Sequence, residues 1–410
     1  MSATVADLLG AGKSGDPHET RLERLLSAAP GLFSGLWAMA FASTVFSIIL
    51  PLMLGRYTAP LQQGGLGLTE TQAGLAATAE MLAIAIAGSI APMIIHRSWR
   101  VVAGLSVAFA AFVTLLSAGV TDFAPLLTLR ILAGLALGVC MAAGAAGIVN
   151  VKDPERCYTA IIVVNAVAFS LSLAVGGLVA ERFGAAGLFI ALAAAFALVS
   201  PFVRQLRFEE PHPQAVSSNA SPAWYVWAGI LVVGLYNLSA SGLYALTEMI
   251  ARQAGFNGSI IGAVIGCGPI LGIAAAAIVS IAVNEKHRFR VLIAMLAFSA
   301  LAAVLLGAAN RQEAFVLGYL LFEMCFWGAL PLMLGFVVRL DRSALVASLQ
   351  SAAILYGSAL APSISTLLND HGAGFSDVGK VFGCIDILCI VILMTIVAAT
   401  RSRLQANERI

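Results

Sequence analysis

Three ionisable residues, Glu80, Arg130 and Glu323, lie inside long apolar stretches of the sequence. An ionisable side chain in membrane hydrocarbon costs about 2.5–3.5 kcal/mol on insertion scales, so it normally faces a cavity or a partner. At a rise of about 1.5 Å per helical residue, all three are expected near the middle of a bilayer or slightly outside it. We predict that they meet in one water-accessible chamber, where Glu323 exchanges protons with the assistance of Arg130 and Glu80.

Glu323 is the first candidate, because Tyr319 and Trp327 lie four residues before and after it on one helical face. A carboxyl group between a phenol and an indole suits an aromatic or cationic ligand. A dry setting favours the protonated acid, so protons can load and unload there. The alternative is a protonated Glu323 that is hydrogen-bonded to a neighbouring helix, with the aromatic rings only packing.

Arg130 stays charged at any relevant pH and needs an anion. Candidate partners are Glu80, Glu323 and a substrate carboxylate, and the alternative is a structural clamp between helices. Glu80 is the partner of Arg130, a proton carrier or both. For Asp386 we expect a local hydrogen-bonding role, and the sequence assigns no role to Glu248 at the edge of its span.

Other polar or aromatic residues in the apolar stretches are candidate substrate contacts. Polar side chains in membrane helices more commonly form hydrogen bonds between neighbouring helices. The candidates are Trp37, Asn165, Tyr236, Asn237 and Gln350.

The composition indicates an integral membrane protein. Of 410 residues, 60% are hydrophobic and 11% are charged, whereas a soluble domain has roughly 45–50% apolar and about 25% charged residues. The net charge of +2 gives no reason to expect nucleic acid as a partner. The six cysteines form no CxxC pair and the five histidines fall in expected loops, so we expect neither disulfide nor metal site.

The sequence has no constellation that indicates catalysis or ATP hydrolysis. GxxxxGK[ST], GxSxG and HExxH are all absent. We therefore expect no catalytic residues, no cofactor and no enzyme activity.

Twelve stretches are long and apolar enough to cross a bilayer as helices. They are 31–54, 71–95, 101–119, 124–149, 159–180, 185–202, 224–247, 259–283, 291–309, 314–338, 344–368 and 381–400. The fold expected is an all-α polytopic protein of two pseudo-symmetric six-helix bundles, 31–202 and 224–400. A cytoplasmic tail (1–30), a cytoplasmic linker (203–223) and a second tail (401–410) complete the chain. Most of the 23 Lys and Arg residues fall in loops on one side, which predicts that both termini are cytoplasmic.

The two halves share glycine positions. Gly67 and Gly74 are followed at an offset of 188 residues by Gly255 and Gly262. Two related halves predict a pseudo-twofold axis along the membrane normal, with a binding site between the halves at mid-depth.

With twelve spans, a central linker and related halves, the chain resembles the major facilitator superfamily of secondary transporters from about residue 31 to 400. Arg130 followed by Gly134 resembles that family's Arg-xxx-Gly signature on the fourth span. The family's loop after span two has an Asp four residues after a Gly, where this chain has Pro92 after Gly88. The resemblance implies that the first, fourth, seventh and tenth spans line the cavity.

These observations predict an alternating-access secondary active transporter of a small organic solute, coupled to protons. It is expected to be a monomer in the inner membrane. Alternatives are an exporter of amphipathic drug-like compounds by proton antiport, and a non-transporting solute sensor or membrane scaffold with this fold.

Overall fold

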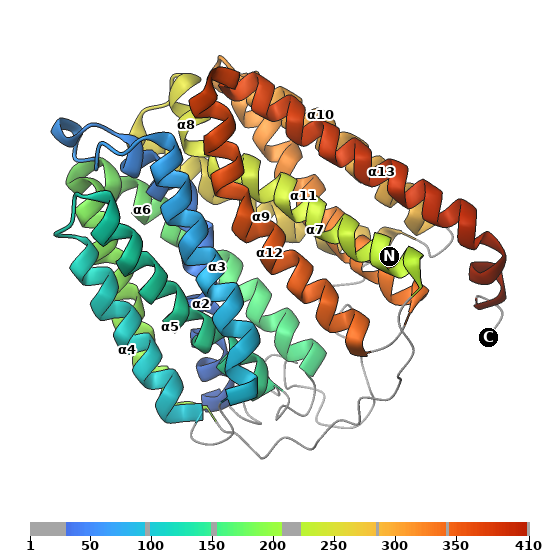
Figure 1. Cartoon of the computed structure of the whole chain (residues 1–410), viewed down its shortest axis with the longest axis horizontal. Coiled ribbons are helices and arrows are strands. Elements are labelled where there is room, and N and C mark those ends of the chain that lie inside the picture. The colour runs from blue at the N-terminus through green and yellow to red at the C-terminus, as the bar shows by residue number, and fades with distance from the viewer. Residues whose placement is uncertain are drawn as a thin grey trace, which may run out of the picture.

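The computed structural model describes residues 30–94, 99–148, 154–206, 223–283, 287–341 and 344–407. These residues are helical almost throughout (Figure 1). The predicted N-terminal tail, apart from Pro30, and most of the predicted linker lie outside the described residues. The long helices are α2 (Pro30–Thr58), α3 (Glu70–Ile94), α4 (Trp99–Ser117), α5 (Phe123–Ile148), α6 (Pro154–Val199), α7 (Trp224–Ala245), α9 (Gly258–Ala282), α10 (Arg288–Gly307), α11 (Gln312–Leu340), α12 (Ala344–Leu368) and α13 (Gly374–Asn407).

The predicted spans coincide with helices of the structure. Ten helical segments of the described chain are long and apolar enough to cross a membrane. Two of them, 160–205 and 349–400, each contain two predicted spans, and non-helical backbone at Gly184 and at Gly372 separates the spans as predicted. The predicted span 224–247 extends two residues beyond α7, which stops at Ala245 and is followed by a short helix, α8 (Thr247–Gln253).

Local sequence explains where α3 begins. Thr69 and Gln72 form a reciprocal capping box before α3. The Thr69 hydroxyl accepts from the Gln72 amide, and the Gln72 side chain accepts from the Thr69 amide, both at 3.2 Å.

The backbone carries the predicted internal repeat. Gly67 and Gly255, 188 residues apart, have φ of 64° and 91°. Gly184 and Gly372, at the same offset, have φ of 64° and 84°. Glycine is the residue that adopts positive φ without a steric penalty. Two turns of this kind therefore recur at corresponding places in the two halves.

Glycines also permit the closest contacts between the two halves, where α3 packs on α12 and α6 packs on α9. An added Cβ at Gly74 of α3 would collide with Thr366 of α12, and one at Gly262 of α9 would lie 2.7 Å from the Cα of Gly177 of α6. Gly74 and Gly262 correspond to each other at the repeat offset of 188 residues. The same glycine position therefore permits close packing at both contacts between the halves. In Figure 1 the blue-to-green helices lie to one side of this seam and the yellow-to-red helices to the other.

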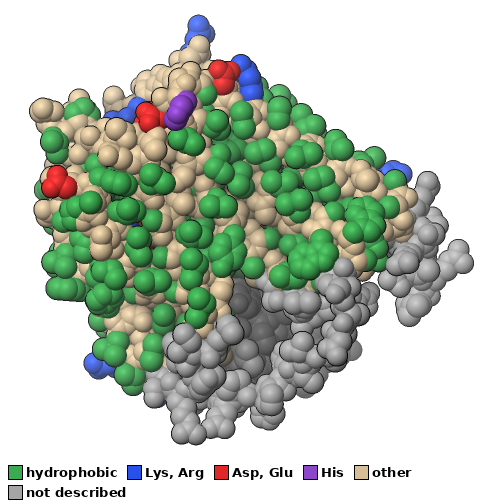
Figure 2. Space-filling model, viewed as in Figure 1, with side chains coloured by type: hydrophobic (Ala, Val, Ile, Leu, Met, Phe, Trp, Pro, Cys, Tyr) green, Lys and Arg blue, Asp and Glu red, His purple; other side chains and the backbone are tan. Residues whose placement is uncertain are grey.

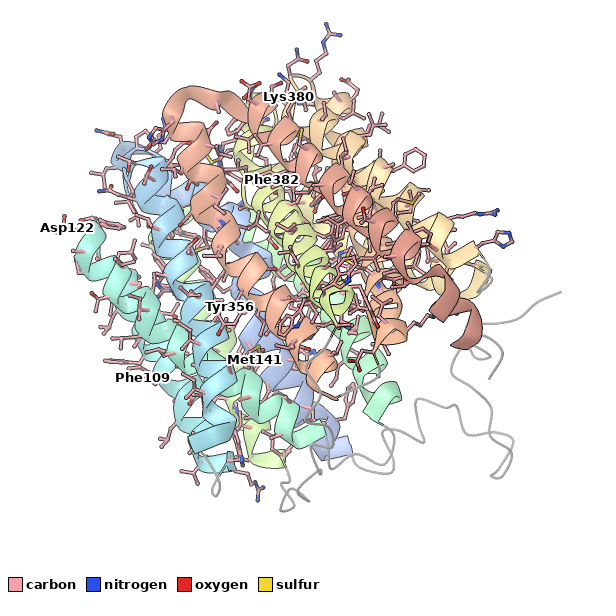
Figure 3. The ribbon with its side chains drawn as sticks, turned by 45° about the vertical axis from the view of Figure 1, so that its right-hand side comes forward. Phe109, Asp122, Met141, Tyr356, Lys380 and Phe382 are labelled. Atoms are coloured by element: carbon pink, nitrogen blue, oxygen red, sulfur yellow. The ribbon has the colours of Figure 1, made fainter. Side chains whose placement is uncertain are left out.

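Close packing also occurs within each half. Gly134 and Gly138 of α5 lie against the backbone of α3, as their spacing of four residues predicts. Large apolar side chains cover the outside of the helices (Figure 2), and Phe109 points outward from α4 (Figure 3). An apolar exterior of this kind is suited to contact with lipid chains.

Candidate functional site

A central cavity of about 270 Å³ lies between the two halves. Both halves contribute to its wall, and Met141 lies beside the seam in Figure 3. The lining residues are Ser43, Thr44, Ser47, Ile48, Leu50, Met81, Ile84, Met141, Phe169, Ala240, Ser241, Tyr244, Pro269, Phe322, Glu323, Phe326, Trp327, Ile354, Leu355 and Ser358. Glu323 is the one carboxyl group among these described lining residues, and they include no Lys, Arg or His.

Glu323 is held on α11 by the two aromatic residues that the sequence singled out. Trp327 donates from Nε1 to Glu323 Oε2 at 3.1 Å. The Tyr319 hydroxyl donates to the Ile265 carbonyl of α9 at 2.7 Å and also lies within hydrogen-bonding reach of Glu323. The Glu323 carboxyl group is therefore oriented at the wall with 4% of the residue exposed.

The neighbouring helix α9 fits this cluster through two glycines spaced four residues apart. An added Cβ at Gly268 would lie 2.7 Å from the Glu323 carboxyl carbon, and one at Gly272 would collide with the Trp327 indole. The absence of side chains at these two positions creates the space that the carboxyl group and the indole occupy.

Hydroxyl groups from α2 face the cavity from the opposite half. The Ser43 hydroxyl donates to the Met39 carbonyl at 2.9 Å, and the Thr44 hydroxyl donates to the Ala40 carbonyl at 2.6 Å. Because each hydroxyl donates to its own helix, its oxygen is left as an acceptor for a ligand. Across the cavity, the Tyr244 hydroxyl of α7 donates to the Ile48 carbonyl of α2 at 2.6 Å.

Arg130 and Glu80 form an ion pair away from the cavity. Arg130 Nη1 lies 3.3 Å from Glu80 Oε2, and both side chains are fully buried between α5 and α3. Arg130 also donates to the Ser117 hydroxyl of α4 at 2.6 Å, and its guanidinium lies 4.9 Å from the Phe189 ring centroid. The expectation that Arg130, Glu80 and Glu323 share one chamber is therefore not met in this conformation.

The remaining candidates do not belong to the cavity wall. Tyr236 donates to the Cys325 carbonyl at 3.2 Å, and Asn237 donates to the Val233 carbonyl of its own helix at 2.9 Å. Asn165 and Gln350 are buried. Trp37 stacks on Phe41, which stacks in turn on the lining residue Phe169.

Several lining residues were not predicted, chiefly hydroxyl-bearing ones. Ser43 and Ser47 lie one residue before and three residues after Thr44 on the first span, and Ser241 precedes Tyr244 by three. The spacing of three, which puts two polar groups on one helical face, was the available signal. Hydroxyl groups are so often satisfied by their own helix that this signal is weak.

Polar contacts join the two halves at one end of the molecule, which we call the bridged end. They connect α3 and α6 with α8 and with the turn Asn369–Ala373. Thr71 donates to Asp370 at 2.5 Å, and Arg252 lies 3.7 Å from Glu181.

Glu248 lies within the bridged end, on α8. Its carboxylate accepts from Arg252 at 2.5 Å and is 2% exposed. The space for it exists because Gly55 of α2 has no Cβ. Burial raises the pKa of Glu248, although the neighbouring Arg252 acts in the opposite direction.

The fold and the cavity between two related halves define a membrane transporter. The model of the Major Facilitator Superfamily matches residues 32–362, and the chain belongs to this family. It is accordingly a secondary transporter and not an enzyme, as the sequence predicted. No curated protein sequence matches the chain.

Solved transporter structures share the fold at low sequence identity. The nucleoside transporter NupG is 12% identical with a TM-score of 0.68, and the match covers 89% of this chain and 99% of NupG. A POT family transporter in complex with 5-aminolevulinic acid is 11% identical with a TM-score of 0.70 (90% and 96% covered). The human organic anion transporter MFSD10 is 18% identical with a TM-score of 0.60 (92% and 100% covered).

Proposed function

We propose that this transporter exchanges protons for a small organic solute that is cationic or neutral and has an aromatic part. The observation that carries the proposal is the position of Glu323, the one carboxyl group among the described residues of the cavity wall. An ionisable residue at such a place in a membrane protein is a proton or ligand site by default. The solved relatives handle solutes as different as nucleosides and 5-aminolevulinic acid, so they leave the substrate open.

The lining supports this substrate class. A cation gains a counter-charge from Glu323, and the rings of Phe322, Phe326 and Trp327 offer stacking and cation–π contact. A carboxylate substrate finds no basic side chain among the described lining residues, and it would face the like charge of an ionised Glu323. Hydroxyl oxygens on α2 offer acceptors to amino or hydroxyl groups of the solute.

The proposed cycle uses one carboxyl group in two states. Protonation of Glu323 removes a buried negative charge and lets the halves rock without a solute. Loss of the proton produces the carboxylate, which then binds the cationic solute in its place. Competition between proton and solute for one group links their movements, since neither binds while the other is held.

We assign proton exchange to Glu323 and a bracing role to the Glu80–Arg130 pair. That pair has no exposed surface, and its contacts tie α3, α4 and α5 together. The predicted coupling role of Glu80 and Arg130 would require a second conformation that opens the pair to water.

Export of amphipathic cations is the second candidate, favoured by the predominantly apolar and aromatic wall. Export differs from uptake in the direction of solute movement. Transport assays in vesicles with a known orientation of the protein measure that direction. We propose that the bridged end faces away from the cytoplasm, since the basic loops predict cytoplasmic termini. In this conformation the cavity then opens toward the cytoplasmic side of the inner membrane.

Proteoliposomes that contain a pH-sensitive dye test the proposal. Aromatic amines, nucleosides and aromatic carboxylates are added in turn, and proton movement is recorded for the native protein, Glu323→Gln and Glu313→Gln. Glu313 lies exposed on the first turn of the same helix and is the matched control. We expect an aromatic amine or a nucleoside to move protons in the native and Glu313→Gln proteins only. Full proton movement in Glu323→Gln, or a response to carboxylates alone, would overturn the proposal.

A further inference from the structure

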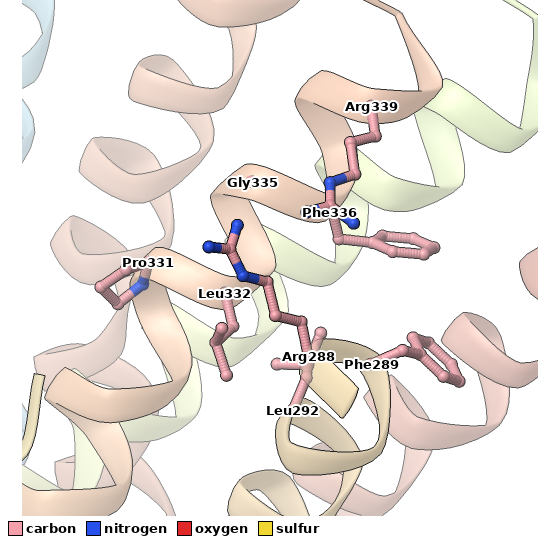
Figure 4. Close-up of a pocket in the computed structure, with 8 residues that line it drawn as sticks. All are labelled: Arg288, Phe289, Leu292, Pro331, Leu332, Gly335, Phe336 and Arg339. Atoms are coloured by element: carbon pink, nitrogen blue, oxygen red, sulfur yellow. The ribbon is translucent and has the colours of Figure 1, made fainter. Parts of the chain in front are cut away.

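A second pocket lies at the junction of α10 and α11, separate from the central cavity (Figure 4). Its volume is about 70 Å³, and no residue lines both spaces. It is lined by Arg288, Phe289, Leu292, Pro331, Leu332, Gly335, Phe336 and Arg339. All of these belong to the C-terminal half, and the proposed transport cycle uses none of them.

The pocket combines two cations with an apolar wall. Arg288 is the first residue of α10, and Arg339 lies in the last turn of α11. The start of α10 and the end of α11 therefore lie side by side at the pocket. Figure 4 shows both side chains extending over the pocket. Phe289 and Phe336 pack at 5.6 Å between ring centroids and form one side of it.

The pocket extends from the helix ends into the apolar part of the surface. Pro331 lies eight residues before Arg339, which corresponds to about 12 Å along the helix. Pro331 and Gly335 are both exposed, and an added Cβ at Gly335 would meet no atom within 4 Å. The wall below the arginines is thus open to the surroundings of the protein, at the depth where the upper part of a lipid chain lies in a bilayer.

The charges at this helix end select an anion. Beside the lining residues Arg288 and Arg339, the described ionisable residues within two positions in the sequence are His287, Arg290 and Asp341, of which Asp341 alone is acidic. Arg288, Arg339 and Asp341 also interact with other groups of the protein, so a phosphate would share the donors, of which each guanidinium has five. Arginine suits phosphate because its planar fork can donate two parallel hydrogen bonds.

We propose that this pocket binds the phosphate of an anionic phospholipid, with one acyl chain along Leu332 and Gly335. The small volume fits a phosphate-sized group beneath the arginines, and the exposed apolar wall fits the chain that a lipid carries. A soluble phosphate could bind the arginines, but it has no apolar part to contact the apolar wall. Basic pockets between membrane helices are known to hold such headgroups, and each basic residue contributes to the attraction.

Lipid retention measured by native mass spectrometry tests this site. The native protein and its variants are purified from nanodiscs of phosphatidylcholine with or without phosphatidylglycerol. We expect Arg288→Gln and Arg339→Gln each to lower phosphatidylglycerol retention about fivefold. The matched control is Arg290→Gln, because Arg290 is exposed at the same helix end but does not line the pocket. An equal loss in Arg290→Gln would show a non-specific charge effect and overturn the site.

A second variant tests the apolar wall without removing charge. Gly335→Leu fills open space, so it leaves the fold intact while covering the place proposed for the acyl chain. We expect it to lower phosphatidylglycerol retention, whereas unchanged retention would contradict the proposal. In a further experiment, the melting temperature of the native protein in detergent is measured with added inorganic phosphate and with added phosphatidylglycerol. Thermal stabilisation by phosphate equal to that by phosphatidylglycerol would identify a free anion as the ligand and overturn the lipid assignment.

Discussion

Gly268 of α9 provides the space that the carboxyl group of Glu323 occupies on α11. A Cβ at position 268 would lie 2.7 Å from the carboxyl carbon, which is closer than real Cβ contacts allow. Gly268→Ala should therefore displace Glu323 from Trp327, at a cost of about 1–3 kcal/mol from overpacking. The expected result is weaker solute-driven proton movement in proteoliposomes with the protein still folded.

Gly104→Ala is the control for this substitution. Gly104 lies on α4, where an added Cβ meets nothing within 4 Å. Gly104→Ala should transport as the native protein does. If Gly268→Ala also transported normally, the fit between α9 and the Glu323 carboxyl group would have no functional importance.

Trp327→Phe keeps an aromatic ring in the cavity wall but removes the donor to Glu323 Oε2. A buried group that loses its hydrogen-bond partner costs about 1–3 kcal/mol, so solute affinity should fall roughly 5- to 150-fold. Binding of an active solute by calorimetry measures the change. A loss as large in Phe326→Leu, which removes a ring but no hydrogen bond to Glu323, would assign the effect to stacking.

The Glu80–Arg130 pair predicts a double-mutant result. Removal of one partner from a buried pair costs about 3–5 kcal/mol, because the other charge is left uncompensated. Arg130→Met should thus lower the melting temperature sharply in detergent, and Arg130→Met with Glu80→Gln should recover much of the loss. The double variant should also retain proton-coupled transport. Loss of coupling in a stable double variant would return these residues to the coupling mechanism.

The sequence predicted the helices well because the length of an apolar stretch decides whether it spans a membrane. It also predicted that Tyr319, Glu323 and Trp327 share one face of one helix, and the structure brings these side chains together. The depth estimate for Arg130 was compatible with a meeting with Glu323. Depth says nothing about which way a side chain points around its helix, and contacts with Ser117 and Phe189 hold Arg130 inside its own half.

The boundary between the fifth and sixth spans illustrates the same limit. The length of the apolar stretch predicted two helices. The turn that joins them depends on the backbone of Gly184, which lies against Gly64 of a loop far away in the sequence. A contact between residues so distant in sequence leaves no periodic pattern in either segment. The matching glycine at position 372 was the available indication that the join is a turn.

Glu248 predicts a pH dependence of stability. Burial raises its folded-state pKa above the ordinary value of 4.5, so its stabilising contribution is complete below that value and is lost as the pH rises through the folded pKa. Glu248→Gln resembles the protonated form. Its melting temperature should fall less than that of the native protein between about pH 5 and about pH 8. Glu313→Gln should follow the native curve, and an unchanged slope in Glu248→Gln would refute the assignment.

The bridged end predicts that a covalent link there stops transport. Thr71 and Asp370 belong to different halves and are hydrogen-bonded at 2.5 Å. Thr71→Cys with Asp370→Cys should arrest solute exchange after treatment with a short thiol cross-linker, and a reducible linker should restore it on reduction. Each single cysteine variant is the control for reaction at the native cysteines. Full exchange by the linked protein would show that the halves need not separate at this end.

The single carboxyl group in the cavity wall has an electrical consequence. One proton on Glu323 carries the same charge as one monovalent cation bound to its carboxylate, so the loaded cavity has the same net charge with either occupant. A cycle that trades one for the other transfers no charge across the bilayer. Such a carrier would respond to a difference in acidity between the two compartments and would be indifferent to voltage.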